Sequence, residues 1–406
     1  MKRVLAAARI AQEGSLYVLL FLLPFSPAAV EIMFGVMLIG WLIERLHPQT
    51  RTKTVWCEPP LRPLLIAMGV FLAMCALSIL VSDYPDKSIQ GFINKWLEYV
   101  LFGVITADIA VRPRVMQRAL TCLTASSAMV VVETVSQEVL GHGLFRGYSL
   151  LTYGRVTGPY TNPADLGTYL MVLIPILLTF GMTRHGWYRA GLVLLLLLFI
   201  GYLGKTEASG AWVALIVALG AMITQDRRLR RYGIAVMVLL VLAAVLWLSH
   251  VGRLGRTISP SDVGTQDRIV MWKSAANMIK DRPLLGHGLN TFMANYLKYW
   301  VGGERQPRYA HNCYLQMAAE TGLLGLFAFL ALLDALFLRW LAGLRLLAGD
   351  ERIILCGLSA GLLAFAVHAG VDTNFYSLRQ VTLFWVLAGL AIGLTERAVR
   401  NVPAHP

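Results

Sequence analysis

Long apolar runs without charge constrain the fold of this chain most strongly. Two of them, 191–203 (GLVLLLLLFIGYL) and 234–248 (IAVMVLLVLAAVLWL), contain no charged residue. Runs of this kind, once extended to roughly 20 residues, are long enough to cross a bilayer as helices. Hydrophobic residues make up 57% of the chain, against roughly 45–50% in a soluble domain. The chain is therefore predicted to be an all-α polytopic membrane protein.

Twelve transmembrane helices are predicted from these runs, and they fill nearly the whole sequence. Their expected ranges are 11–26, 28–46, 62–81, 90–110, 116–139, 163–182, 189–204, 208–224, 232–250, 312–338, 352–370 and 378–396. Residues 1–406 are thus expected to form a single integral membrane domain. Its one large loop, at 251–311, lies between the ninth and tenth spans.

Lysine and arginine are distributed unevenly between the loops, and this distribution predicts the orientation. An even number of spans places both termini on one side. If that side is the inside, 21 of the 36 basic residues fall in inside segments, and the strongest anchor is 226–231, DRRLRR. The expected topology is N-in and C-in, with the large loop on the outer face.

The loop at 251–310 breaks this positive-inside trend. It carries nine basic residues and four acidic ones, a net charge near +5. The basic residues are Arg253, Arg256, Arg268, Lys273, Lys280, Arg282, Lys298, Arg305 and Arg308. One interpretation is a solvated loop with scattered charge. We favour a site for an anionic ligand, such as the phosphate of a lipid carrier or glycolipid, and we expect no nucleic acid partner.

The segment 265–283 within this loop predicts an amphipathic helix. Its apolar residues recur at helical spacing, at Ile269, Trp272, Ala276 and Ile279. Thr265 is expected to cap its start and Pro283 to follow its end. Arg268 and Trp272 are four residues apart and share a face. The alternative is a helix that only lies on the bilayer interface.

A glycine turn at 283–292 is then expected to lead into a second short helix at roughly 290–300. His311 and Asn312 follow, directly before the apolar run at 312–338. One of these two residues is expected to cap the new helix. The partial positive charge of the helix N-terminus disfavours imidazolium, and a neutral imidazole is what a general base needs. The alternative is that His311 only caps or hydrogen-bonds.

Two further polar groups are candidates for the same outer face. His368 and Asp372 lie four residues apart and can hydrogen-bond one another as supporting residues. In 152–168, TYGRVTGPYTNPADLGT, Asn162 is expected to cap a helix that begins at Pro163. A helix cap does not explain Arg155, which lies close to it.

Four stretches in this order resemble the O-antigen ligase / O-antigen polymerase superfamily. They are Arg155 to Gly167, the RxxxW at Arg268–Trp272, PLLGHG at 283–288 and HNCYLQMAAETGLLG at 311–325. The resemblance covers roughly residues 150–390. It implies about twelve spans, one large helical periplasmic loop and a functional histidine directly after that loop, which is His311 here.

The resemblance also implies site residues. Arg268 matches the loop arginine of the family, and Arg155 and Asn162 match the motif before the sixth span. One departure is KTEASGAW at 205–212, where Ser209 stands at a position that often holds arginine. Lys205 is expected to supply the missing charge, and Asn312 to assist substrate binding beside His311.

The activity that the resemblance implies is glycosyl transfer from an undecaprenyl-diphosphate-linked glycan to lipid A-core. The enzyme would lie among the lipids of a Gram-negative inner membrane and act on the periplasmic side. His311 would be the general base, the configuration would invert, and no cofactor or metal is expected. The alternatives are an O-antigen polymerase, a protein O-oligosaccharyltransferase and, from another class, a polyprenyl-glycan transporter. Ionisable residues toward the span ends favour an interfacial site over a permeation path.

Overall fold

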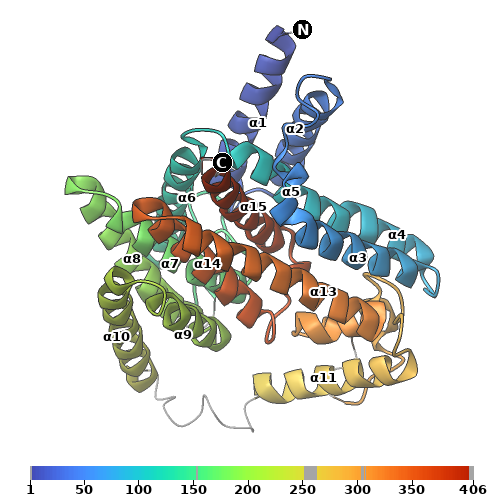
Figure 1. Ribbon diagram of the computed structural model, residues 1–406. Helices are drawn as coiled ribbons and strands as arrows, with labels where there is room; N and C mark the ends of the chain where they lie inside the picture. Colours follow the sequence, from blue (N-terminus) through green and yellow to red (C-terminus); the bar gives the residue numbers. More distant parts are fainter. Residues whose placement is uncertain (1, 152–153, 251–262, 303–305, 307, 402–406) are drawn as a thin grey trace.

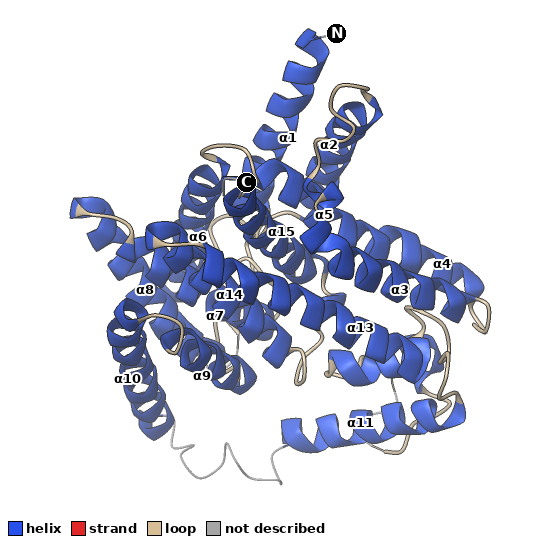
Figure 2. Ribbon diagram, in the orientation of Figure 1, coloured by secondary structure: helices blue, strands red, loops and turns tan. Residues whose placement is uncertain are grey.

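Helices are the regular elements throughout the described part of the chain, which contains no strand (Figure 2). The computed structural model describes residues 2–151, 154–250, 263–302, 306 and 308–401. The predicted charges of Arg253, Arg256 and Arg305 lie outside this description. The all-α polytopic class is confirmed.

The helices follow one another in the order shown in Figure 1. They are α1 (Lys2–Leu22), α2 (Pro27–Leu46), α3 (Arg62–Ile79), α4 (Pro85–Gly91), α5 (Glu98–Ala110), α6 (Val115–Leu140), α7 (Pro163–Met182), α8 (Gly186–Thr206), α9 (Ser209–Ile223), α10 (Arg227–His250), α11 (Val263–Asp281), α12 (Phe292–Tyr296), α13 (Cys313–Leu346), α14 (Gly349–His368) and α15 (Leu378–Asn401). Short 3₁₀ turns occur at Val55–Cys57, Pro59–Leu61 and Asn374–Tyr376.

The twelve expected spans correspond to helices in this structure. The span at 90–110 is composite, because a π-helical stretch at Phe92–Leu97 joins α4 to α5. Within the described residues, nine helices are long and apolar enough to cross a membrane. They are α1, α2, α3 with its preceding turn, α6, α7, α8, α13, α14 and α15. The count of twelve and the orientation stay predictions.

Helices α7 and α15 form the centre of the bundle, and their side chains are almost all buried. Small residues let the neighbouring helices approach them closely. A Cβ added at Gly361 of α14 would lie 2.4 Å from the Val172 carbonyl oxygen of α7. One added at Gly389 of α15 would lie 2.6 Å from the Gly103 carbonyl oxygen of α5. The perimeter helices α1, α2, α3 and α8 instead expose leucine, isoleucine and valine, as lipid-facing helices do.

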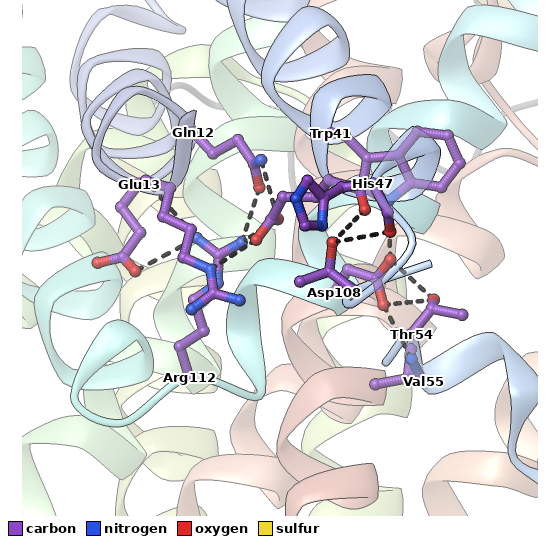
Figure 3. A network of polar contacts seen from close by, with 11 residues as sticks. Gln12, Glu13, Trp41, His47, Thr54, Val55, Asp108 and Arg112 are labelled. Carbon is purple, nitrogen blue, oxygen red and sulfur yellow. Dashed lines mark hydrogen bonds and ion pairs between the residues drawn. The ribbon is translucent and has the colours of Figure 1, made fainter. Parts of the chain in front are cut away.

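A buried polar network ties α1, α2 and α5 together at one end of the bundle, with Gln12 of α1 donating to Glu44 of α2 at 3.0 Å (Figure 3). The carboxylate of Asp108 accepts hydrogen bonds from Trp41 Nε1 at 2.7 Å and Thr54 Oγ1 at 2.6 Å. The Glu44 carboxylate accepts from Arg112 Nη2 at 2.7 Å. Buried carboxylates persist when they are paired and hydrogen-bonded in this way. These acids therefore have a structural role.

Helix α13 is broken at Gly322, whose φ of 72° and ψ of 178° are not helical. The turn at 283–288 fills this break with its own backbone. The amides of His287 and Gly288 donate to the carbonyls of Ala319 and Glu320 at 3.0 and 2.8 Å. The Leu323 amide donates to the Pro283 carbonyl at 2.7 Å. The PLLGHG motif thus satisfies backbone groups that the break would otherwise leave unpaired.

The loop helices differ from their predicted form in three respects. Thr265 lies inside α11 and does not cap it, because the helix already begins at Val263. The second helix, α12, is shorter than predicted. Its start is held by the Glu320 carboxylate, which accepts from the amides of Asn290 at 2.8 Å and Phe292 at 3.2 Å. The buried face of α11 also differs from the predicted one. The predicted end of α11 before Pro283 is confirmed.

Replacing Gly322 with alanine is expected to destabilise the protein. The positive φ alone costs an L-residue roughly 1–3 kcal/mol, and the new Cβ would lie 2.0 Å from the Leu284 carbonyl oxygen. The matched control is Gly220→Ala in α9, where nothing lies within 4 Å of the added atom. Thermal unfolding in detergent would show a lower midpoint for Gly322→Ala alone. Equal midpoints for the two variants would contradict the close docking of the turn.

Candidate active site

The start of α13 separates the roles of His311 and Asn312. Asn312 is the N-cap, and its Oδ1 accepts hydrogen bonds from the amides of Tyr314 and Leu315, both at 3.0 Å. His311 precedes the cap with a φ of 46°, in the left-handed region. Side chains other than glycine seldom adopt this region, and such positions often occur at functional sites. The predicted cap is therefore Asn312, and His311 has another partner.

That partner is Asp372, in the connection between α14 and α15. His311 Nδ1 lies 3.5 Å from Asp372 Oδ1. The second carboxylate oxygen, Oδ2, lies 4.0 Å from His368 Nε2 at the end of α14. His368 and Asp372 are thus neighbours as expected, but their 4.0 Å separation is too long for the hydrogen bond that their spacing allows. Asp372 lies between two imidazoles, which the sequence did not indicate.

The exposure of the three side chains differs in a way that matters for chemistry. The His311 side chain is 39% exposed, whereas Asp372 is 13% and His368 is 3% exposed. His368 is also held from behind, since its Nδ1 lies 3.3 Å from Thr168 Oγ1 of α7. Only the His311 ring is therefore open to a substrate, while the other two groups support it from the protein side.

Asp372 is ionised in this setting. Burial by itself raises the pKa of Asp372. The hydrogen bond with His311, the charge of His368 and the Thr373 amide outweigh burial and lower the pKa below its ordinary value. The Thr373 amide donates to Asp372 Oδ1 at 2.8 Å. The site therefore contains a carboxylate held against the histidine ring.

Arg268 belongs to the same region of the structure. It lies half-buried on α11, close enough for its charge to act on His368. Helix α11 lies below α13 in Figure 1 and packs against it. Arg268 acts on His368 and His311 contacts Asp372, so two residues that are 43 positions apart in the sequence lie at the same site.

The face by which α11 packs is not the predicted one. A cluster between α11, α12 and the start of α13 buries Met271, Ala275, Met278, Phe292, Tyr296, Ala310 and Ala319. The predicted stripe is displaced, and Ile269 is exposed. Periodicity alone did not distinguish the two apolar stripes of this helix. Contact with α13 selects the stripe that includes the two methionines.

Arg155 and Lys205 form a second cluster, where α8 ends. Arg155 Nη2 donates to the Thr206 carbonyl at 3.0 Å, and its Nε lies 3.6 Å from a Glu207 carboxylate oxygen. A cation at a helix C-terminus binds the carbonyls that lack a helical partner. Lys205 forms an ion pair with Glu138 of α6. Among the described contacts, none joins Lys205 to His311.

Helix α7 connects this second cluster to the site formed by His311, Asp372 and His368. Asn162 caps α7 as predicted, with its Oδ1 accepting from the Ala164 amide at 2.9 Å. A Cβ added at Gly167, one turn later, would lie 3.3 Å from Thr206 Oγ1. Thr168, the next residue, contacts His368. The N-terminal turns of α7 therefore connect the arginine and lysine pair to the histidine site.

Sequence reasoning missed two charged residues here, Asp165 and Arg379. Asp165 is close enough to Asp372 for their charges to interact. Arg379 Nη1 donates to the carbonyls of Pro24 at 2.6 Å and Pro159 at 3.0 Å. An acid in the first turn of α7 was a possible signal, because helix N-termini favour carboxylates. Within the described residues, no group of three or more His, Cys, Asp or Glu side chains is arranged to hold a metal.

The fold and this site define an integral membrane protein with a histidine–carboxylate pair and arginines at the ends of its helices. Residues 169–330 match a protein-family model described as O-Antigen ligase. The resemblance drawn from the motifs is thereby confirmed. The matched segment contains Arg268 and His311, whereas Arg155, Asn162 and Asp372 lie outside it.

A curated relative agrees with this family match. It is a protein of Rickettsia felis (strain ATCC VR-1525 / URRWXCal2) with the name "Putative polysaccharide ligase". It is 23% identical over 283 residues, which span 65% of this chain and 65% of the relative. The family model and the relative thus carry descriptions of the same kind, O-Antigen ligase and putative polysaccharide ligase.

Proposed function

We propose that the chain transfers O-antigen glycan from undecaprenyl diphosphate to lipid A-core on the periplasmic side of a bacterial inner membrane. The observation that carries this proposal is the contact of an exposed His311 with an ionised Asp372, with the charge of Arg268 close by. The family match supports the choice of a lipid-linked glycan as donor.

His311 acts as the general base. An acceptor hydroxyl is a weak acid, and a positioned base accelerates its attack by typically ~10²–10⁴-fold. Because Nδ1 of His311 faces Asp372, Nε2 takes the proton. Asp372 holds the ring and stabilises the imidazolium that forms. The hydroxyl oxygen then bonds to the anomeric carbon of the donor.

The diphosphate leaves with the electron pair of the broken bond between the anomeric carbon and oxygen. Cationic side chains stabilise that developing charge. Arg268 is the favoured ligand, since Arg155 and Lys205 already have carboxylate partners. Asn162 and Asn312 use their carbonyl oxygens as caps, so their amide NH₂ groups are the atoms that we assign to substrate oxygens. Attack opposite to the leaving group inverts the anomeric configuration.

A reconstituted transfer assay tests this function. Purified protein in detergent would receive a synthetic undecaprenyl-diphosphate glycan and lipid A-core, with EDTA present. Because guanidinium groups supply the positive charge, glycan is expected on lipid A-core despite the chelator. Glycan that only lengthens on undecaprenyl diphosphate would make the chain a polymerase with the same site. Movement of the lipid-linked glycan across vesicles, without any new glycosidic bond, would make it a transporter.

Replacing Arg268 with alanine is expected to lower kcat/KM for the donor. A charge-assisted contact is worth roughly 1.5–3 kcal/mol, which corresponds to a loss of roughly 10–100-fold. Lys273→Ala is the matched control, because Lys273 is an exposed cation on the same helix. Initial rates at varied donor concentration would separate the two variants. An equal loss in both would mean that only the general charge of the loop matters.

A further inference from the structure

A hollow of about 400 Å³ lies at the end of α14 opposite His368, and arginines surround it. Arg189 comes from the first turns of α8, and Arg227, Arg228 and Arg231 come from the first turns of α10. The remaining lining residues are Met182, Tyr232, Asp350 and Ile353. Two helices that are separate in sequence, α8 and α10, thus bring guanidinium groups to one hollow, and α14 adds Asp350 to its wall.

The charge of this hollow is not balanced by the protein. Four guanidinium groups and one carboxylate give it a formal charge of +3. Within the described residues, none of the four arginines forms an ion pair with a carboxylate; Arg189 contacts the Tyr232 hydroxyl at 3.4 Å. Asp226 is already engaged, because it accepts from the Arg228 amide at 2.7 Å and lies 3.9 Å from Arg352. Converging like charges repel unless an anion lies between them.

The surface that continues from the hollow along α10 is apolar. Arg231 is followed on the same helical face by Ile234, Val238 and Leu242, all of which are exposed. Tyr232, also exposed, lines the hollow, and tyrosine is enriched where transmembrane helices meet lipid headgroups. A positive hollow above an apolar stripe matches the chemistry of an anionic lipid, with a phosphate at one end and acyl chains below it.

We propose that this hollow binds the headgroup phosphate of an anionic glycerophospholipid, whose acyl chains lie along the exposed stripe of α10. Basic pockets between transmembrane helices bind such headgroups in this manner. The 20 residues of α14 separate the hollow from His368, roughly 30 Å of helix. The lipid site is therefore distinct from the transfer site and does not depend on the proposed function.

A general excess of positive charge on one side of the membrane is the alternative. A general excess of charge would not require four arginines to line one hollow. Arg230 allows the two explanations to be compared. Arg230 lies on the same helix, between Leu229 and Arg231, and it is exposed but does not line the hollow. Removal of its charge changes the net charge of this end as much as removal of any one lining arginine.

Lipid retention by the purified full-length chain tests the proposal. The chain would be incubated in detergent with phosphatidylglycerol or with phosphatidylcholine, and bound lipid would be counted by native mass spectrometry. Retention of phosphatidylglycerol is expected to exceed that of phosphatidylcholine and to fall roughly tenfold in Arg227→Gln/Arg231→Gln. It is expected to persist in Arg230→Gln. The unfolding midpoint of each variant, measured with and without phosphatidylglycerol, gives a second readout that requires only folded protein.

Each other outcome overturns the proposal. Unchanged retention in the double variant would show that lipid binds elsewhere. An equal loss in Arg230→Gln would show that net charge alone attracts the lipid. Displacement of phosphatidylglycerol by millimolar inorganic phosphate would identify a site for free phosphate anions in place of a lipid site. If the double variant does not fold, Arg228→Gln is measured in its place, and it is also expected to retain less phosphatidylglycerol than the wild type.

Discussion

Replacing His311 should nearly eliminate glycan transfer while leaving the protein folded. Loss of a general base lowers the rate by ~10²–10⁴-fold. Asn312, not His311, caps α13, so the helix start keeps its hydrogen bonds. His311→Asn is the better variant, because asparagine tolerates the left-handed backbone that this position requires. Transfer rates and unfolding midpoints would be measured side by side.

The control is His142→Ala, which removes an exposed histidine from a turn between α6 and α7. It is expected to retain wild-type transfer. If His311→Asn also transferred glycan at a near-normal rate, His311 would be no base and the mechanism would be wrong. If His311→Asn unfolded, the residue would have a structural role that its hydrogen bonds do not explain.

Asp372→Asn is expected to lower kcat by roughly 10²–10⁴-fold, as in other histidine–carboxylate pairs. Asparagine keeps the shape of the side chain but removes the charge that stabilises imidazolium. Asp372 lies behind His311, so KM for both substrates should change little. Asp372→Glu should restore part of the rate. A rise in KM with kcat unchanged would instead indicate that Asp372 binds substrate.

The dependence of stability on pH provides a second readout for Asp372. Its pKa is lowered in the folded protein, so its ionised form adds stability above the unfolded pKa, about 3.9. That contribution is lost as the pH falls through the lowered, folded pKa. The unfolding midpoint of the wild type should therefore exceed that of Asp372→Asn at neutral pH, and the difference should shrink in acid. A difference independent of pH would exclude this linkage.

Sequence patterns anticipated the helices well, because an apolar run of membrane-spanning length has few other stable forms. The caps at Asn162 and Asn312 were also predictable, since an asparagine side chain directly before a helix can accept hydrogen bonds from amides of the first turn. Local chemistry of this kind needs no knowledge of tertiary packing. The predicted start of α11 at Thr265 was wrong. Several neighbouring positions there can begin a helix, and local chemistry does not choose among them.

The partner of His311 was not predictable, since Asp372 lies 61 positions later in the sequence. Their meeting depends on how α13 packs against α14. The Cys313 amide donates to the Ala369 carbonyl at 2.8 Å, and the Tyr314 hydroxyl donates to the Ala366 carbonyl at 2.6 Å. These two bonds bring the start of α13 to the end of α14. Sequence periodicity describes each helix separately and contains no information on such contacts.

The docking of the 283–288 turn into α13 determines which half of the site can move. The C-terminal end of α11 is fixed twice, by the backbone bonds of this turn and by Arg282, whose Nη1 donates to the Val81 carbonyl at 2.8 Å. Any swing of α11 must then pivot near Pro283. Arg268, roughly 20 Å along the helix from that pivot, would travel farthest, whereas His311 would stay in place at the start of α13. In the proposed mechanism, the arginine that binds the diphosphate therefore lies on the part of the site that can move, and the proposed base lies on the fixed part.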